Sequence, residues 1–282
     1  MQTDEKQSTR LSTARSRELG EELRRVRHRA GMSSGLVTEA LGWSLGKLSK
    51  LETGTRGTSP WEIGTLLGRC GADKATRERI MAIANEPDTG SFLRRHATAA
   101  DDLLAVALHE GVARAIATYE PITVPSLAQT EDYARALTGD HDLAGARVAR
   151  QENLNRADGP DTVVYVHEIA LRLVVGDVGV MRDQVLHLTA LCGRPRYGPR
   201  VIPMTAAAHA ALRHPATVLT FNAPFKPLVY TETDAATVFH DDPTTVTVYQ
   251  AKMRRLHRLA LDAERSRDLL ARWAEVYDRE TR

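Results

Sequence analysis

The sequence predicts an all-α N-terminal domain of four or five helices, followed by an α+β C-terminal domain. Residues 15–85 carry apolar residues three and four positions apart, which is the period of amphipathic helices, between serines and glycines that begin and end helices. Residues 95–282 alternate such segments with short runs rich in β-branched and aromatic residues. Two domains also fit the length of 282 residues, since a domain commonly has about 100–200.

Composition narrows the classes of protein that the chain can belong to. Its apolar runs are much shorter than the ~18–20 uncharged residues that cross a membrane, and the charged N-terminal stretch does not resemble a secretory signal. Cys70 and Cys192 are the only cysteines and form no CxxC pair, which argues against a disulfide framework or a zinc site. We therefore expect a cytoplasmic protein without a membrane segment, a metal or a cofactor.

Charge is divided unevenly along the chain. Residues 1–86 contain 15 Lys and Arg against 11 Asp and Glu, whereas residues 87–282 contain 23 against 25. A basic excess at the N-terminal end is a weak indication of nucleic-acid binding in that domain.

The first two helices are predicted from their apolar residues and from the residues that end them. Leu19, Leu23, Val26 and Ala30 share one face of a helix that Gly31 ends. A short second helix begins after Ser33 or Ser34, either of which can cap it. Its predicted inner face is Leu36, Val37, Ala40 and Leu41.

A tight turn and a third helix follow at once. Gly42 can adopt the positive φ of the turn, and Ser44 can cap a helix whose buried residues are Leu48 and Leu51. Two helices joined by three or four residues around a glycine form a helix-turn-helix. Ser59-Pro60 then begins a fourth helix, and residues 75–84 form a fifth.

Three segments resemble the Cro/cI-type repressors, also called the xenobiotic-response-element family. They are Leu23-Arg24-Arg25-Val26-Arg27, Gly31-Met32-Ser33 and residues 41–54, in which Leu48-Ser49-Lys50-Leu51-Glu52-Thr53-Gly54 follows the family pattern closely. Two positions depart from it: Ser34 replaces a glutamine that commonly touches phosphate, and Thr38 replaces a small alanine. The resemblance implies double-stranded DNA as the partner.

The third helix carries the residues that we expect to contact DNA. Its first turn and outer face present Leu45, Gly46, Lys47 and Lys50 to base edges in the major groove. The helix starts at Ser34 and Ser44 offer amides to phosphate, and Thr53, Arg56 and Thr58 lie on a loop that skirts the DNA backbone. Trp43 is expected to fill the core beneath the turn.

The C-terminal domain is predicted to begin after a linker at residues 86–94 and to span residues 95–282. Helices are expected at 130–137, 142–155 and 180–191, with two more closing the chain, and strands at 112–119, 162–166, 200–204, 217–221 and 228–231. Of the last two helices, the first buries Val246, Met253 and Leu256, and Asp262 caps the second.

This domain is similar to the uncharacterised domain that follows the helix-turn-helix in many actinobacterial regulators. The similarity rests on Tyr119-Glu120-Pro121, residues 124–137, Val201-Ile202-Pro203-Met204 and Phe239-His240-Asp241-Asp242-Pro243. It implies an antitoxin-like regulator encoded beside a small acidic partner protein.

Catalytic patterns are weak, and we expect no enzyme. Gly31-Met32-Ser33-Ser34-Gly35 matches a nucleophile elbow in letters only, because the elbow needs a preceding strand. Arg194, Arg196 and Arg200 beside Tyr197 form either an anion site or, as we favour, a solvated loop.

Together these observations predict a homodimeric, sequence-specific transcriptional regulator, because one short helix reads too few bases for useful selectivity. Its C-terminal domain is expected to sense a small protein or a ligand. The alternative is an antitoxin-like protein that neutralises a partner and uses its helix-turn-helix only for autoregulation.

Overall fold

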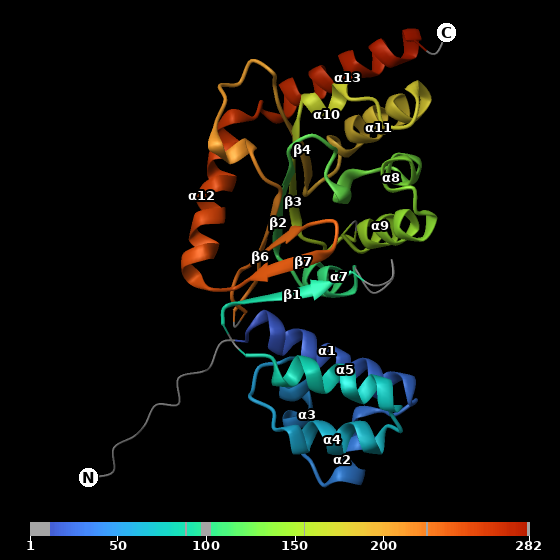
Figure 1. Ribbon diagram of the computed structural model, residues 1–282, viewed down its shortest axis with the longest axis vertical. Coiled ribbons are helices and arrows are strands. Elements are labelled where there is room, and N and C mark those ends of the chain that lie inside the picture. Colours follow the sequence, from blue (N-terminus) through green and yellow to red (C-terminus); the bar gives the residue numbers. More distant parts are fainter. Residues whose placement is uncertain (1–11, 88, 97–102, 155, 224, 281–282) are drawn as a thin grey trace, which may run out of the picture. The chain divides into compact units, whose positions relative to one another are not determined.

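The structure is a computed structural model that describes residues 12–87, 89–96, 103–154, 156–223 and 225–280 (Figure 1). It divides into two compact units. Unit 1 comprises Met1–Thr89 and Asn222–Lys226, and unit 2 comprises Gly90–Phe221 and Pro227–Arg282. Each unit is described by itself.

The described part of unit 1 contains five helices, in agreement with the four or five that the sequence predicts. They are α1 (Ala14–Arg29), α2 (Ser34–Leu41), α3 (Leu45–Glu52), α4 (Pro60–Arg69) and α5 (Lys74–Asn85). A side-chain oxygen caps the N-terminus of each helix, and the capping residues are Thr13, Ser33, Ser44, Ser59 and Asp73. Each cap accepts a hydrogen bond from an amide that the helix itself leaves unpaired, which explains why short helices begin sharply at these positions.

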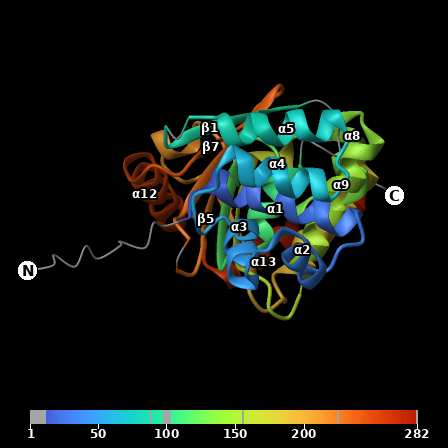
Figure 2. The same cartoon turned by 90° about the horizontal axis from the view of Figure 1, so that it is seen from below.

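One apolar core joins the five helices. Helix α1 packs against α3, α4 and α5, while α2 packs against α3 and α4. Figure 2 shows these helices from below, with α1, α4 and α5 lying lengthwise across the view. The core residues include Leu23, Leu48 and Leu66. The expectation that Leu36 faces this core is wrong: its side chain is 55% exposed, because Val37 and Leu41, four residues apart, form the inner face of α2.

Two features fix α1 against α3. The guanidinium of Arg27 donates to both carboxylate oxygens of Glu52, at 2.6 and 2.8 Å, and also to the carbonyl of Met32 at 2.9 Å. This pair is buried, and the hydrogen bond to Glu52 raises the pKa of Arg27. At Gly20 the helices touch so closely that a Cβ atom would lie 2.5 Å from the Glu52 carbonyl oxygen.

Unit 2 is built on one mixed sheet, which confirms the α+β class. Its strands lie in the order β1-β7-β6-β5-β2-β3-β4, in which β2, β3 and β4 are parallel and the other neighbours are antiparallel. The strands are β1 (Ser91–Arg95), β2 (Ala115–Glu120), β3 (Asp161–His167), β4 (Tyr197–Ile202), β5 (Ala216–Thr220), β6 (Leu228–Glu232) and β7 (Ala236–His240). The helices are α7 (Leu104–Gly111), α8 (Glu131–Thr138), α9 (His141–Leu154), α10 (Ile169–Arg172), α11 (Val178–Leu191), α12 (Pro243–Leu259) and α13 (Ala263–Glu280), with short 3-10 turns η1 (Ser126–Ala128) and η2 (Ala210–Leu212).

Helices cover both faces of the sheet. Figure 1 shows α12 on one side and α8, α11 and α13 on the other. Alternation along β3 supplies both cores: Val164 and Val166 pack with α11 and α13, whereas Tyr165 packs with α12. Two separate apolar clusters therefore hold this sheet in place.

Three expectations for the C-terminal domain need correction. Residues 91–95, in the expected linker, form the edge strand β1, where the rings of Phe92 and Phe239 stack with centroids 4.8 Å apart. Strand β7 (Ala236–His240) was not predicted at all. Arg200 lies on strand β4, donates to the Leu261 carbonyl oxygen and does not line the cavity beside Arg194 and Arg196, so these three arginines form neither the solvated loop that we favoured nor one anion site.

The outer edge of β4 is occupied by the chain that connects α12 and α13. The Leu261 amide donates to the Val201 carbonyl at 2.8 Å, and the Val201 amide donates to the Ser266 hydroxyl at 3.0 Å. Two residues earlier, Pro199 has no N–H to donate. Leu261 in the connecting chain and Ser266 in α13 thus take the backbone groups of Val201 that a further strand would need.

None of the helices in the described part of the chain combines the length and apolarity that crossing a membrane requires. Among the same residues, no group of three or more His, Cys, Asp or Glu is placed to hold a metal ion.

Candidate nucleic-acid interface

Helices α2 and α3 form the predicted helix-turn-helix. Gly42 ends α2 with a φ of 64°, and the Trp43 amide donates to the Thr38 carbonyl at 2.9 Å across the turn. Ser44 then caps α3 by accepting a hydrogen bond from the Lys47 amide at 3.1 Å. Only residues 42–44 separate the two helices, so their relative orientation is set by local hydrogen bonds.

Thr38 lies in the tight space between the two helices and is buried. Its hydroxyl donates within α2, where the Ser34 and Gly35 carbonyls lie 2.9 and 3.0 Å away. A threonine therefore fits where the family resemblance implies alanine, because its one polar group is satisfied by its own helix.

The outward face of α3 begins with an apolar side chain. Leu45 is 61% exposed, and at Gly46 an added Cβ would meet nothing within 4 Å. Leu48 and Leu51 are each 1% exposed and anchor the opposite face in the core. The first turn of α3 is therefore free to approach a second surface, as the sequence predicts.

Lys50 and Lys47 differ in environment although both lie on α3. Lys50 is exposed, and its side chain forms no hydrogen bond or ion pair with the residues that the structure describes. The Lys47 ammonium instead lies 2.8 Å from a carboxylate oxygen of Glu62, and 4.3 Å from the centroid of the Trp43 ring. Lys50 is thus ready to meet an external anion, whereas Lys47 is already bound within the domain.

Glu62, in the first turn of α4, joins three parts of this surface. Besides Lys47, its carboxylate accepts from the Arg56 guanidinium at 3.0 and 3.2 Å and from the Ser59 amide at 3.2 Å. The Ser59 hydroxyl accepts in return from the Glu62 amide, which completes a capping box. The hydrogen bond from Lys47 is the main cause that lowers the pKa of Glu62, so the carboxylate is ionised at neutral pH.

The remaining predicted contacts lie around the two helix starts and the loop after α3. Ser33 is the cap of α2, and Ser34 is the first helical residue. Since helix α1 precedes Ser33, the surroundings of Gly31–Gly35 are not those of a nucleophile elbow. Thr53 ends α3 and donates its hydroxyl to the Ser49 carbonyl at 2.8 Å.

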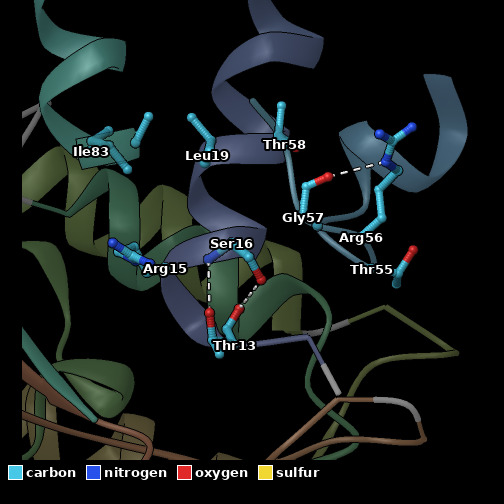
Figure 3. Close-up of a pocket in the computed structure, with 11 residues that line it drawn as sticks. Thr13, Arg15, Ser16, Leu19, Thr55, Arg56, Gly57, Thr58 and Ile83 are labelled. Atoms are coloured by element: carbon cyan, nitrogen blue, oxygen red, sulfur yellow. Dashed lines mark hydrogen bonds between the residues drawn. The ribbon is translucent and has the colours of Figure 1, made fainter. Parts of the chain in front are cut away.

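Arg56 and its neighbours line a cavity of about 230 Å³ between α1, the loop after α3 and the end of α5. Figure 3 shows Arg56 bonded to the Gly57 carbonyl, and the N–O distance is 3.1 Å. At Gly54, which has a φ of 66°, a Cβ atom would lie 2.3 Å from the Ser16 carbonyl oxygen. This close approach holds the loop against the start of α1.

Trp43 agrees only in part with its expected role. Its ring packs against the core of unit 1 but stays half-buried, and its face receives the Lys47 ammonium. Glu62 was not among the residues predicted from the sequence. The signal was present, because Ser59-Pro60-Trp61-Glu62 matches the S/T-x-x-E pattern of a capping box.

Comparison with known families agrees with this division of the chain. A family model described as a helix-turn-helix domain matches residues 18–80, and one described as a domain of unknown function, DUF5753, matches residues 103–272, which is more than half of the chain. The chain belongs to the DUF5753 family. The DUF5753 match runs from the start of α7 into α13, and its description assigns no function. The match at the N-terminal end indicates a DNA-binding regulator. Searches of the curated proteins and of the solved structures returned no match.

Proposed function

We propose that the protein is a sequence-specific, DNA-binding transcriptional regulator of the Cro/cI type that acts by binding rather than by catalysis. The observation that carries the proposal is the free outer face of α3, where Leu45 and Lys50 are exposed and Gly46 leaves open space. The major groove of B-DNA, about 12 Å wide, admits a helix of this kind.

Each of these residues suits a different contact. The Lys50 ammonium is a donor for guanine O6 and N7, and Leu45 is suited to the methyl group of thymine. Gly46 lets the backbone of α3 come close to the bases. The amides at the starts of α2 and α3, near Ser34 and Ser44, and the loop residue Thr53 lie where phosphate contacts would fix the register.

Two further parts of the proposal concern assembly and control. A homodimer would read two half-sites and so multiply the discrimination of one short helix. Unit 2 would control DNA binding through a small protein partner, which is supported by the exposed side chains of Leu137, Leu173 and Val174. A ligand is the alternative, and a cavity of about 700 Å³ beside Arg156, Arg194 and Arg196 is large enough for one.

The experiment starts from random duplex DNA enriched on the full chain, followed by affinity measurements on the selected sequence. We expect Lys50→Ala to weaken binding to that sequence about 5- to 100-fold, equivalent to roughly 1–3 kcal/mol, and to relax selection at one base position. Lys74→Ala is the matched control, because it removes one exposed lysine from α5 of the same unit. If the two variants weaken binding equally, Lys50 does not read a base.

A further inference from the structure

We propose that Glu62 is a positioning residue that holds Lys47 and Arg56 away from DNA phosphates, and that it thereby weakens the part of DNA binding that does not depend on the base sequence. The inference rests on the proposed function and assigns a role to a residue that the helix-turn-helix pattern does not include. Glu62 itself touches no base in this proposal; it acts through the two cations that it binds.

The geometry of the Glu62 carboxylate supports a restraint on both cations. The Glu62 side chain is 10% exposed and accepts hydrogen bonds from Lys47 on α3, from Arg56 on the following loop and from the Ser59 amide. Three segments therefore meet at one anion. An ionised carboxylate that is desolvated to this extent requires its cationic partners, because an unpaired buried charge is far more costly than a paired one.

Trp43 adds a second restraint on Lys47. The ammonium lies over the indole ring at 4.3 Å, within the distance at which a cation is attracted to the ring face. The Lys47 side chain is only 27% exposed, although it belongs to the same helix as the exposed Lys50. Reaching a phosphate would require Lys47 to leave both partners.

The charges around Glu62 determine how strongly DNA binding depends on salt. Two cations beside the interface are offset by one carboxylate, and each lysine or arginine that contacts phosphate steepens the salt dependence of binding. Non-specific DNA binding consists almost entirely of such phosphate contacts. The restraint at Glu62 therefore lowers affinity for any DNA sequence and flattens the salt dependence of binding, while it leaves the contacts to bases intact.

The test uses the full chain and its Glu62→Gln variant. Glutamine is suitable because it can also complete the capping box at the start of α4, so the fold is preserved. Affinity is measured against the selected duplex and against a shuffled duplex over a range of salt concentrations. We expect Glu62→Gln to bind the shuffled duplex about 3- to 30-fold more tightly at low salt. The slope of log K against log salt should steepen by about 0.9 for each released cation.

Two controls separate a restraint from a simple loss of negative charge. Glu78→Gln removes an exposed carboxylate that pairs with Lys74 on α5, and it should leave the slope unchanged. In Lys47→Gln, the further change Glu62→Gln should steepen the slope less than it does in the wild-type chain, because one of the two cations is missing.

The outcomes distinguish this inference from the proposed function. If Glu62→Gln behaves like Glu78→Gln while the wild-type chain still selects a DNA sequence, Glu62 does not restrain the two cations. An equal effect of Glu62→Gln with and without Lys47 also contradicts the restraint on that lysine. A wild-type chain that selects no sequence contradicts the proposed function itself.

Discussion

Neighbouring lysines on one helix have different chemistry in this protein because of a residue outside the helix. Spacing along α3 places Lys47 and Lys50 on one outer face, which is as much as a helical pattern can specify. The distinction between them comes from Glu62, which the loop between α3 and α4 brings within 2.8 Å of Lys47. Local pattern therefore predicted the face correctly, whereas the state of each side chain depended on a tertiary contact.

Lys252 in α12 is a second lysine whose environment the sequence does not reveal. Its ammonium donates to the His214 carbonyl and lies 5.5 Å from the centroid of the Tyr119 ring, and desolvation lowers its pKa from 10.5 to about 8. Because the folded pKa is the lower one, the unfolded chain binds more protons between these two values. The free energy of unfolding should therefore rise with pH from about 8 to 10.5.

We expect Lys252→Met to stabilise unit 2 by about 1 kcal/mol at pH 7, because it removes a charge that burial disfavours. The gain over the wild-type chain should shrink as pH rises through the same window. Lys252→Arg is the control, since a guanidinium does not deprotonate there. Denaturant unfolding at several pH values measures both differences, and a gain that does not change with pH would contradict this interpretation.

At the scale of elements, the helices of unit 1 were the most predictable part of the chain. Ser44, Ser59 and the glycines at 31 and 42 set helix ends through contacts within a few residues, which a sequence displays directly. Strands β1 and β7 were missed because their pairing joins Phe92 to Phe239, residues far apart in sequence. The contacts of Glu62 were predictable in part. Its capping box is a pattern of neighbouring residues, whereas its pairing with Lys47 joins residues that lie on different helices.

A pair of glycines tests the packing of α1 on α3. Gly20→Ala should lower the free energy of unfolding of unit 1 by about 1–3 kcal/mol, since its Cβ would collide with the Glu52 backbone. Gly46→Ala has open space and should keep the stability or raise it by up to about 1 kcal/mol. Urea unfolding compares the two.

The same Gly46→Ala variant should nevertheless weaken selection of DNA, because the new methyl group lies on the face that approaches the bases.

At the scale of the whole molecule, unit 1 and unit 2 have separate apolar cores. The core of unit 1 gathers around Leu23, Leu48 and Leu66, and that of unit 2 lies on both faces of its sheet. The division into a helical and a mixed part was predictable from periodicity alone. The order of the seven strands was not, because it depends on pairings between distant segments.

Separate cores predict two unfolding transitions in calorimetry of the full chain. Gly20→Ala should lower the midpoint of one transition, and Lys252→Met should raise the midpoint of the other. A single transition that both variants shift together would show that the two cores unfold as one cooperative unit.

The two hydrogen bonds of the Val201 backbone, one accepted from the Leu261 amide and one donated to the Ser266 hydroxyl, have a consequence for self-association. An edge strand with unpaired amides and carbonyls can pair with a strand of another copy, which gives fibrils or dimers that share one sheet. Here the chain's own hydrogen bonds occupy the Val201 amide and carbonyl at the outer edge of β4. Strand-by-strand addition of a second copy at Val201 is therefore disfavoured.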